Sequence, residues 1–537
     1  MFFALAVFCR ISYNGNIMHS LVLLAVAKLI LTSWDIGSLR YDEVLRHVDQ
    51  FDALPFEGAV LPSWDVKLAN GRTGAYNSIL TDAEWDRAAL EAKATILREL
   101  TRHRSFKELF MGCRLCGYGR LDWRDDAGWK NAAHNYAALA HLAKLGGARG
   151  VWFDPEDYAK KCQYYRIPGD PEYGELFRLA RQRGREVFTA IFSEFPDATL
   201  LSAWFLSFDP DYFGAGAIGD RLKAQGDVWP AFINGMLDVL PPTARVIDGD
   251  EHGYRYEDLA RDFEDAVYRQ RVGALRLVAP ENRAKYRAQV DSSFGLYLDM
   301  YVHDEKDGWY FGPLGGSRLA HFAANLNRAL TTSDSYVWVY SQKYSWAKYV
   351  DTINRNNHFD RKRFWTTEMP GLDRVLLAAR SPSAFLAQFP EAGAASPNRA
   401  TGKPASWQSA YRHEINNRTG TFLPEVPAMV GVPHGCLMYP VRDVKPGELY
   451  RVSVKVKGEH ASSQVKWQKD GKWTSLPGRI LECGAADPDG WRTFETVVIV
   501  PAGADILNFS VWAWLAENER VELKDASVRL IDPANVR

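Results

Sequence analysis

Eight short apolar runs alternate with longer amphipathic stretches between residue 28 and about residue 380, and this alternation constrains the fold more than any other feature of the chain. Short apolar runs bounded by turn residues are typical of buried strands. Strands that alternate with helices form parallel sheets. The predicted strands are Lys28–Trp34, Gly58–Pro62, Leu109–Leu115, Arg149–Asp154, Thr199–Ser207, Arg245–Asp250, Phe294–Tyr301 and Tyr336–Ser341. They predict an α/β fold of the (β/α)8 type, the TIM barrel, whose functional side chains stand at the C-terminal ends of the strands.

Most of these runs are separated by stretches in which apolar residues recur at the helical period. The predicted helices are Asp82–Arg102, Trp129–Leu145, Pro171–Phe195, Val228–Leu240, Tyr256–Val290 and Ser317–Leu330. Each would cross from the end of one strand to the start of the next, as a barrel requires.

The period changes from helical to alternating after residue 404. Residues 381–404 are rich in Ala, Ser, Pro and Gly and predict a linker. Beyond them, apolar and polar residues alternate in Leu449–Lys457, Gln464–Gln468, Thr493–Val500, Ile506–Leu515 and Val521–Ile531. We therefore expect a barrel over residues 28–380 and an antiparallel β-sandwich of the jelly-roll type over residues 405–537.

Residues 1–27 predict either a secretory signal peptide or a start assigned too far upstream. The apolar run Leu21 to Thr32 begins after Met18 and contains Ala25-Val26-Ala27, which fits the small-residue rule for cleavage after Ala27. A cleaved chain would be secreted or periplasmic. Leu29 to Thr32 also fits a first core strand, and the two interpretations are compatible. Neither this run nor the other N-terminal apolar run, Phe2 to Cys9, reaches the roughly 18 residues of a membrane span.

The composition narrows the class of partner. The chain has 65 Lys+Arg and 66 Asp+Glu, a formal charge of -1, which gives no electrostatic reason to expect nucleic acid or an acidic membrane. Its 18 Trp, 24 Tyr and 27 Phe supply flat faces that suit sugars. Of the six cysteines, only Cys436 and Cys483 share a late segment, which makes them the candidate pair. The sequence does not indicate an oligomeric state.

Two pairs of acids follow predicted strands of the barrel. Asp154 and Glu156 come after the fourth strand, and Asp250 and Glu251 after the sixth. Cleavage of a glycosidic bond needs one carboxylic acid to protonate the departing oxygen and a second carboxylate to attack the sugar or activate water. We expect Glu156 to be the general acid/base, Glu251 its partner carboxylate, and Asp154 and Asp250 to position or tune them. Helix caps or ion pairs are the alternative roles for each acid.

Further polar and aromatic residues are predicted at the barrel mouth as contacts for a carbohydrate substrate. They are Trp34, Trp123, Asp125, Tyr254, Tyr340 and Gln342. The first strand is followed by Trp34-Asp35-Ile36 and not by the His-x-His of metal-dependent amidohydrolase barrels, so no metal is expected. No dinucleotide fingerprint, phosphate-binding loop or Ser/His/Asp elbow stands in the sequence, and no cofactor is expected.

The stretch Gly150-Val151-Trp152-Phe153-Asp154-Pro155-Glu156 resembles the strand-four motif of chitinase-type sugar-cleaving barrels, in which the Glu of Asp-x-Glu is the acid. That motif carries further Asp residues upstream, where this chain has Gly150 and Trp152. Leu29 to about Arg380 resembles a group of uncharacterised bacterial barrel proteins similar to glycoside hydrolases. The resemblance rests on Asp122 to Asp126, Phe153 to Tyr158, Arg181 to Arg185 and Val337 to Tyr340. It implies a glycoside hydrolase.

The end of the chain resembles carbohydrate-binding modules of the family 4 and 9 type, on the segments Trp491 to Ala504, Leu507 to Trp514 and Val521 to Leu530. The resemblance implies that sugar lies on a concave sheet face. Trp512 and Trp514 share one strand face by parity, and core packing is the alternative for either. For the barrel, the alternative is a catalytically inactive glycan-binding protein, because Gln342 stands where similar barrels often have a Glu, and Gln does not titrate.

Overall fold

The structure is a computed structural model that describes residues 27–75, 79–80, 83–115, 120–156, 163–207, 217–348, 360–409, 419–423 and 425–536. The predicted signal peptide therefore lies outside the described residues except for Ala27. Asp157 and Tyr158 of the strand-four motif lie outside them as well, as do Cys9, Cys116 and Cys162.

A nine-stranded parallel sheet forms the barrel, in the order β10-β11-β1-β2-β5-β6-β7-β8-β9. Its strands are β1 (Lys28–Ser33), β2 (Gly58–Pro62), β5 (Phe110–Arg114), β6 (Gly150–Asp154), β7 (Thr199–Ser202), β8 (Arg245–Asp248), β9 (Val290–Ser292), β10 (Phe294–Tyr297) and β11 (Tyr336–Ser341). The two end strands, β9 and β10, are consecutive and separated only by Ser293, whose N–H donates to the Asp248 carbonyl at 3.0 Å. They act as the two halves of one strand, so the sheet closes and the predicted (β/α)8 barrel is confirmed.

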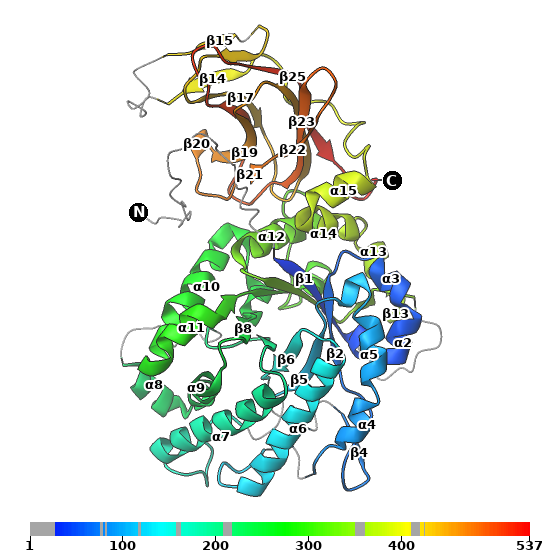
Figure 1. Cartoon of the computed structure of the whole chain (residues 1–537), viewed down its shortest axis with the longest axis vertical. Coiled ribbons are helices and arrows are strands. Elements are labelled where there is room, and N and C mark those ends of the chain that lie inside the picture. The colour runs from blue at the N-terminus through cyan, green and yellow to red at the C-terminus, as the bar shows by residue number, and fades with distance from the viewer. Residues whose placement is uncertain are drawn as a thin grey trace.

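Helices surround this sheet (Figure 1). They are α1 (Trp34–Gly37), α2 (Tyr41–Arg46), α3 (Val48–Asp52), α4 (Arg87–Glu91), α5 (Ala94–Leu100), α6 (Asp126–Leu145), α7 (Tyr173–Glu194), α8 (Ile218–Gln225), α9 (Trp229–Val239), α10 (Asp262–Arg271), α11 (Arg283–Gln289), α12 (Arg318–Thr332), α13 (Trp365–Glu368), α14 (Leu372–Arg380) and α15 (Pro382–Gln388). Two-stranded pairs, β3 (Val66–Lys67) with β4 (Thr73–Gly74) and β12 (Tyr344–Ser345) with β13 (Asp360–Phe364), lie outside the main sheet.

Several predicted elements are shorter in the structure or divided, as Asp82–Arg102 is into α4 and α5. The stretch Tyr256–Val290, predicted as one helix, is divided because Gly273 and Pro280 disfavour a helix interior. The predicted strand Thr199–Ser207 ends at Ser202, whose hydroxyl donates to the Trp204 carbonyl at 2.5 Å. The predicted strand from Phe294 ends at Tyr297 and continues as a 3-10 helix, Leu298–Tyr301.

Two tryptophans fill the interior of the barrel. Trp152 on β6 and Trp338 on β11 meet edge to face, with ring centroids 4.8 Å apart. The Trp338 indole N–H donates to the Gly249 carbonyl at 2.9 Å, so this side chain spans the barrel from β11 to the end of β8. Gly295 makes room for it, because a Cβ there would lie 2.4 Å from the Trp338 ring. The two indoles belong to the core, as expected for residues in strand bodies.

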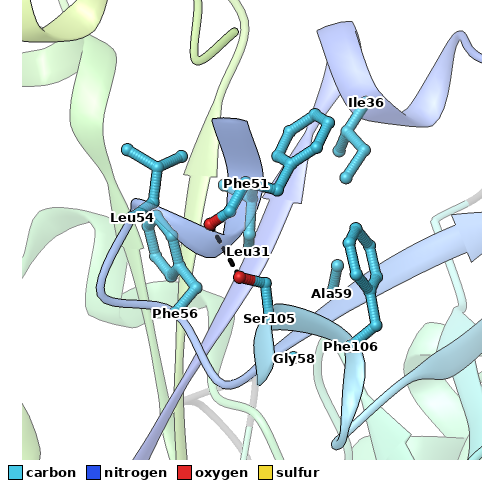
Figure 2. A pocket seen from close by; sticks show the side chains of 9 residues that line it. All are labelled: Leu31, Ile36, Phe51, Leu54, Phe56, Gly58, Ala59, Ser105 and Phe106. Atoms are coloured by element: carbon cyan, nitrogen blue, oxygen red, sulfur yellow. Dashed lines mark hydrogen bonds between the residues drawn. The ribbon is translucent and has the colours of Figure 1, made fainter. Parts of the chain in front are cut away.

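A small apolar pocket lies outside the barrel wall, where β1 and β2 meet α3 (Figure 2). It is lined mainly by apolar side chains such as Leu31, Phe51 and Phe106, and the Ser105 hydroxyl at its edge donates to the Phe51 carbonyl at 2.6 Å. The space leaves no room for a water molecule. It is a packing gap between the sheet and its helices and holds no ligand-sized cavity.

The C-terminal region forms two antiparallel sheets, which confirms the predicted sandwich. One sheet contains β14 (Ala405–Gln408), β17 (Gly435–Arg442), β19 (Ala461–Lys469), β20 (Lys472–Trp473), β21 (Arg479–Ile480) and β24 (Ile506–Ala513). The other contains β15 (Thr421–Leu423), β16 (Ala428–Val430), β18 (Leu449–Lys457), β22 (Glu482–Ala486), β23 (Trp491–Ile499) and β25 (Arg520–Ile531). Cys436 and Cys483 lie on different sheets and are free, so the pairing considered from the sequence is wrong.

The segment predicted as a linker contains helix α15, which lies between the barrel and the sandwich (Figure 1). Pro382 at its first turn and the Ser381 hydroxyl, which accepts from the Ala384 N–H, favour a helix start that a count of Ala, Ser and Pro does not reveal. Phe385 and Phe389 pack in the same hydrophobic cluster as the barrel core. In the described part of the chain, every helix is too short or too polar to cross a membrane.

Candidate active site

The register of three neighbouring strands sets the heights of the predicted catalytic acids. Phe153 of β6 is level with Ser202 of β7, and Ser202 is level with Asp248 of β8. Glu156 and Glu251 each stand three residues beyond that level, on two strands with one strand between them. The structure therefore brings the two glutamates to the same edge of the barrel, as the sequence predicted.

Asp154 ends strand β6 and organises the turn that carries Glu156. Its Oδ1 accepts the Glu156 backbone N–H at 3.0 Å, and its Oδ2 lies 3.4 Å from the Arg114 Nε on β5. Burial raises the pKa of Asp154, and the charge of Glu156 adds to the rise, while Arg114 opposes it. A carboxyl in this setting holds a proton more tightly than a free aspartate.

Glu251 begins a short 3-10 helix, Glu251–Arg255, directly after β8. Burial raises its pKa to about 9, and the negative charges of Glu156 and Asp154 contribute to that rise. The Tyr254 hydroxyl, one turn further along, hydrogen-bonds to the Glu251 side chain and opposes the shift. Because the charges of Glu156 and Asp154 both act on Glu251, the acids at the ends of β6 and β8 form one electrostatically coupled group.

Asp250 and Asp248 are fully buried beside this group. Asp250 has φ of 37°, and its Oδ2 accepts from the Tyr256 hydroxyl at 2.9 Å, while its Oδ1 has no hydrogen-bond partner among the described residues. Burial and the charge of Asp248 raise the pKa of Asp250 to about 8. Asp248 accepts from the Ser207 hydroxyl at 2.7 Å, and burial raises its pKa to about 6. Asp250 thus anchors the turn that carries Glu251, and its catalytic positioning role stays a prediction.

Three tyrosines pack together next to Glu251. Tyr254 lies parallel to Tyr340 with ring centroids 5.8 Å apart, and Tyr297 lies within 5.3 Å of both. Tyr254 also rests on Trp338 at 5.2 Å. The Trp338 indole, which fills the barrel interior, therefore supports the tyrosine cluster through its contact with Tyr254. Tyr340 is half-buried, which leaves part of its ring open.

Gln342 is held from both sides. Its side-chain oxygen accepts from the Tyr297 hydroxyl at 2.8 Å, and its side-chain N–H donates to the Tyr340 hydroxyl at 2.5 Å. Its backbone N–H donates to Asp299 at 3.0 Å, and burial raises the pKa of Asp299 to about 7. The predicted residues Tyr254, Tyr340 and Gln342 thus come together with Glu251.

Tyr297, Asp299 and Arg114 were not among the predicted site residues. Tyr297 is level with Tyr340 at the end of the seventh strand, but the prediction extended that strand to Tyr301 and so missed the end residue. Asp299 lies in the 3-10 helix that follows β10, within the stretch predicted as strand. Arg114 lies on β5 and affects the site through its ion pair with Asp154. The spacing of residues along the chain does not reveal this contact.

Two predicted substrate contacts have other roles. Trp123 is 0% exposed and stacks on Trp129 at 5.1 Å, so it is a core residue and offers no face to a sugar. Asp125 caps helix α6, where its carboxylate accepts the Gly128 N–H at 2.9 Å. Helix capping is a usual role for an Asp directly before a helix, and this exposed carboxylate has it. Trp34 stands just past β1 and is half-buried.

No group of three or more His, Cys, Asp or Glu side chains with the geometry to hold a metal ion occurs in the described ranges. The side chains brought together at the site are carboxyl groups, tyrosines and one glutamine.

Comparison with models of protein families gave no match, and comparison with curated proteins gave none. Solved structures similar to the chain include a glucosidase from Croceicoccus marinus, at 9% identity and a TM-score of 0.37, with 91% of this chain and 97% of that chain covered. A Bacteroidetes-affiliated GH5 cellulase has 12% identity and a TM-score of 0.35, over 67% and 91%. The active domain of tailspike protein 4 of bacteriophage CBA120 has 12% identity and a TM-score of 0.17, and the chain spans only 15% of its length. The assignment of the fold rests on the strand pairing described above.

Proposed function

We propose that the protein is a glycoside hydrolase that cleaves a poly- or oligosaccharide at the mouth of its barrel. The observation that carries the proposal is the placement of Glu156 and Glu251 at the same level past β6 and β8, close enough for the charge of Glu156 to raise the pKa of Glu251. Glycosidic cleavage needs such a pair, one carboxyl protonated and one free to act as nucleophile or base.

The electrostatics favour Glu251 as the proton donor, the reverse of the roles expected from the sequence. Its raised pKa keeps it protonated at pH 7, which is the state that a general acid must have. In the first step Glu251 gives its proton to the glycosidic oxygen as the bond to the anomeric carbon breaks. Glu156 supplies the second carboxylate, which attacks that carbon or takes a proton from the attacking water.

The surrounding side chains suit a sugar. Tyr340 is half-buried next to Glu251, and an aromatic face packs against the C–H side of a pyranose. The Gln342 amide is held between two tyrosine hydroxyls and has the donor and acceptor groups that recognise sugar hydroxyls. Arg114 next to Asp154 balances part of the negative charge of the acids.

Turnover of a panel of defined oligosaccharides, followed by chromatography of the products, tests the proposal. We expect wild type to release sugar from at least one member and Glu156→Gln to lose about 10³-fold in kcat with binding retained. The catalytically inactive glycan-binding barrel predicts the opposite pattern, with binding by calorimetry, no release of sugar, and no effect of Glu156→Gln on either. That pattern would overturn the enzyme proposal.

A second proposed function, carbohydrate binding by the sandwich, is favoured by an exposed aromatic patch. Trp407, Cys436 and Trp512 lie side by side across β14, β17 and β24, and the small Cys436 side chain lets the two indoles approach to 5.4 Å. His434 lies 5.1 Å from Trp512 and 5.6 Å from Trp514. Trp407 is 43% exposed and Trp514 39%. We call these four aromatic residues the sandwich platform.

Exposed aromatic faces in one cluster are the usual means of holding a glycan chain by its pyranose rings. Trp467 is buried in the sandwich core and is not part of the platform, while Trp473 is exposed on another strand, β20. Affinity electrophoresis in gels that contain soluble polysaccharides tests the platform, because a bound glycan retards the protein. If retardation survives replacement of Trp407 and Trp512 together, the platform is not the binding surface.

A further inference from the structure

The segment that carries Glu251 runs from the end of β8 to the start of α10, and its first half is anchored inside the barrel. The Gly253 N–H donates to the Asp250 carbonyl at 2.9 Å, which closes the turn. The Tyr256 hydroxyl returns to the Asp250 carboxylate, and it accepts in turn from the Arg269 guanidinium on α10 at 2.7 Å. These bonds fix the direction in which the chain leaves β8.

The second half of the segment is anchored at Asp258, whose side chain is 1% exposed. The Asp258 backbone N–H donates to the Asn325 side chain on α12 at 3.0 Å, and its Oδ1 faces the Arg328 Nε at 2.9 Å. Its Oδ2 accepts the backbone N–H of Ala502 at 2.6 Å. Ala502 belongs to the sandwich, so a buried carboxylate of the segment is held partly by the other domain.

The sandwich sits tightly on the barrel around this bond. A Cβ on Gly447 would lie 1.9 Å from the Ala320 carbonyl of α12, and one on Gly315 would lie 2.2 Å from the Pro446 carbonyl. Leu449, among other sandwich residues, packs in the same hydrophobic cluster as the barrel core. Backbones this close, with apolar packing beside them, resist the sliding that loosely joined domains undergo.

We infer that the sandwich braces the active site: through the bond from Ala502 to Asp258 it holds the segment that places Glu251, and Asp258 is a positioning residue. The inference rests on the proposed function for the role of Glu251, but the brace itself is a mechanical property of the segment. A misplacement of a catalytic group by about 1 Å lowers turnover by about 100-fold. A barrel without this contact would therefore keep its fold and lose much of its activity.

The substitution Ala502→Pro tests the brace because it removes the donated N–H and puts a ring carbon in its place. Ala502 and Gly503 form the turn after β23, and Gly503 has φ of 80°, as at the third position of a type II turn. Proline is favoured at the second position of that turn, which Ala502 occupies. The sandwich turn is thus expected to keep its shape while the proline ring displaces the Asp258 carboxylate. Asp505→Asn is the matched control, since Asp505 is close in the chain and contacts Lys469 within the sandwich.

Hydrogen–deuterium exchange and steady-state kinetics on the full chain give independent readouts. With Ala502→Pro, we expect exchange in peptides covering residues 249–262 to rise at least about fivefold, and kcat to fall by about 10- to 100-fold with KM changed less than about threefold. Asp505→Asn should change neither. Asp258→Ala should loosen the same peptides, and it serves as the second variant if the proline variant fails to fold.

The outcomes separate the brace from the proposed function. Unchanged exchange over residues 249–262 in both variants overturns the brace, whatever the activity. Loosened peptides with unchanged kcat overturn the positioning role of Asp258. If wild type turns over no glycan, the proposed function fails, while the exchange experiment still decides whether the sandwich holds the segment.

Discussion

The barrel mouth and the sandwich platform both gather aromatic side chains, but they bury them to different extents. At the mouth, Tyr254 is 7% exposed and Trp338 only 1%. On the platform, Trp407 and Trp514 expose about two fifths of their surface. At the mouth, the aromatic rings lie next to carboxyl groups. On the platform, the indoles and the His434 ring pack against one another.

Because their exposure differs, aromatic side chains have different roles in the two regions. Buried rings exclude water from the acids beside them, and a carboxyl without water around it keeps its proton to a higher pH. Glu251 and Asp250 show this effect in their raised pKa values. Exposed rings leave their faces open to a ligand. Chemistry is therefore expected at the mouth, and adhesion on the platform.

The largest expected effect is the loss of turnover in Glu251→Gln. Glutamine keeps the size of the side chain and cannot give up a proton, so kcat should fall about 10³-fold while the glycan still binds. Glu305→Gln is the matched control, because Glu305 is exposed on the loop after β10. Initial rates on the best glycan of the panel, with calorimetry for binding, provide the measurement.

Aryl glycosides with acidic leaving groups tell which role Glu251 has. A departing group that needs no proton makes a general acid dispensable, so Glu251→Gln should regain most of its activity on such substrates, and Glu156→Gln should not. Recovery in Glu156→Gln instead would return the two residues to the roles expected from the sequence.

A smaller effect is expected on the platform. Trp512→Ala removes the central ring, which contacts both Trp407 and His434, so the affinity for polysaccharide should fall about 10- to 30-fold. Turnover of a short soluble substrate should be unchanged, because the platform is separate from the mouth. Trp473→Ala is the control, since Trp473 is 56% exposed but belongs to another strand. Equal losses in the two variants would mean that any exposed indole suffices.

The sequence predicted the barrel well because strand and helix periods are local signals. Each of the eight predicted strands matches a strand of the barrel sheet, whereas β9 was not predicted, and Glu156 and Glu251 lie at one edge because the C-terminal ends of parallel strands share it. The errors come from burial, which depends on the whole fold. Trp123 looked like a mouth residue by position, yet it stacks on Trp129 under helix α6 and is fully covered.

The roles of the acids could not be predicted for the same reason. The sequence places Asp250 next to Glu251, but it does not reveal that the chain takes a left-handed turn at Asp250 and sends its carboxylate toward Tyr256. Nor does it give the burial that raises the pKa of Glu251. Position along the chain selects candidates, and packing decides which of them holds a proton.

The pH dependence of stability tests the burial of Asp250, with an effect of a few degrees. Its pKa is about 8 in the folded protein, against 3.8 for an unperturbed aspartate, so the folded state binds a proton that the unfolded state releases. This contribution to stability is present at low pH and is lost as pH rises toward 8. Asp250→Asn keeps the neutral form, so its melting temperature should exceed that of wild type at pH 8 by about 2–4 °C and converge with it as pH falls below about 4, where the unfolded aspartate also keeps its proton.

Asp238→Asn is the matched control with the opposite sign. The Arg181 guanidinium bonds to Asp238 and lowers its pKa to about 2, despite the opposing effect of burial. That contribution is present above the unfolded pKa and is lost as pH falls, so the variant should be less stable than wild type throughout pH 5 to 8. A parallel loss in both variants would mean that Asp250 is ionised in the folded protein.

The smallest effect on ligand binding is expected for Trp123→Phe. Trp123 is fully buried between Trp129 and Tyr164, so the change should cost about 1–3 kcal/mol of unfolding free energy through the cavity it leaves. Binding of glycan at the mouth should stay within about twofold of wild type. Tyr340→Phe is the useful contrast, because it keeps the ring and removes the hydroxyl that accepts from Gln342. Chemical denaturation measures the stability of each variant, and calorimetry on the same samples measures its binding of glycan. A Trp123 variant with normal stability and weakened binding would place this indole at the mouth. The distinction between buried supporting rings and exposed binding rings would then fail for the barrel.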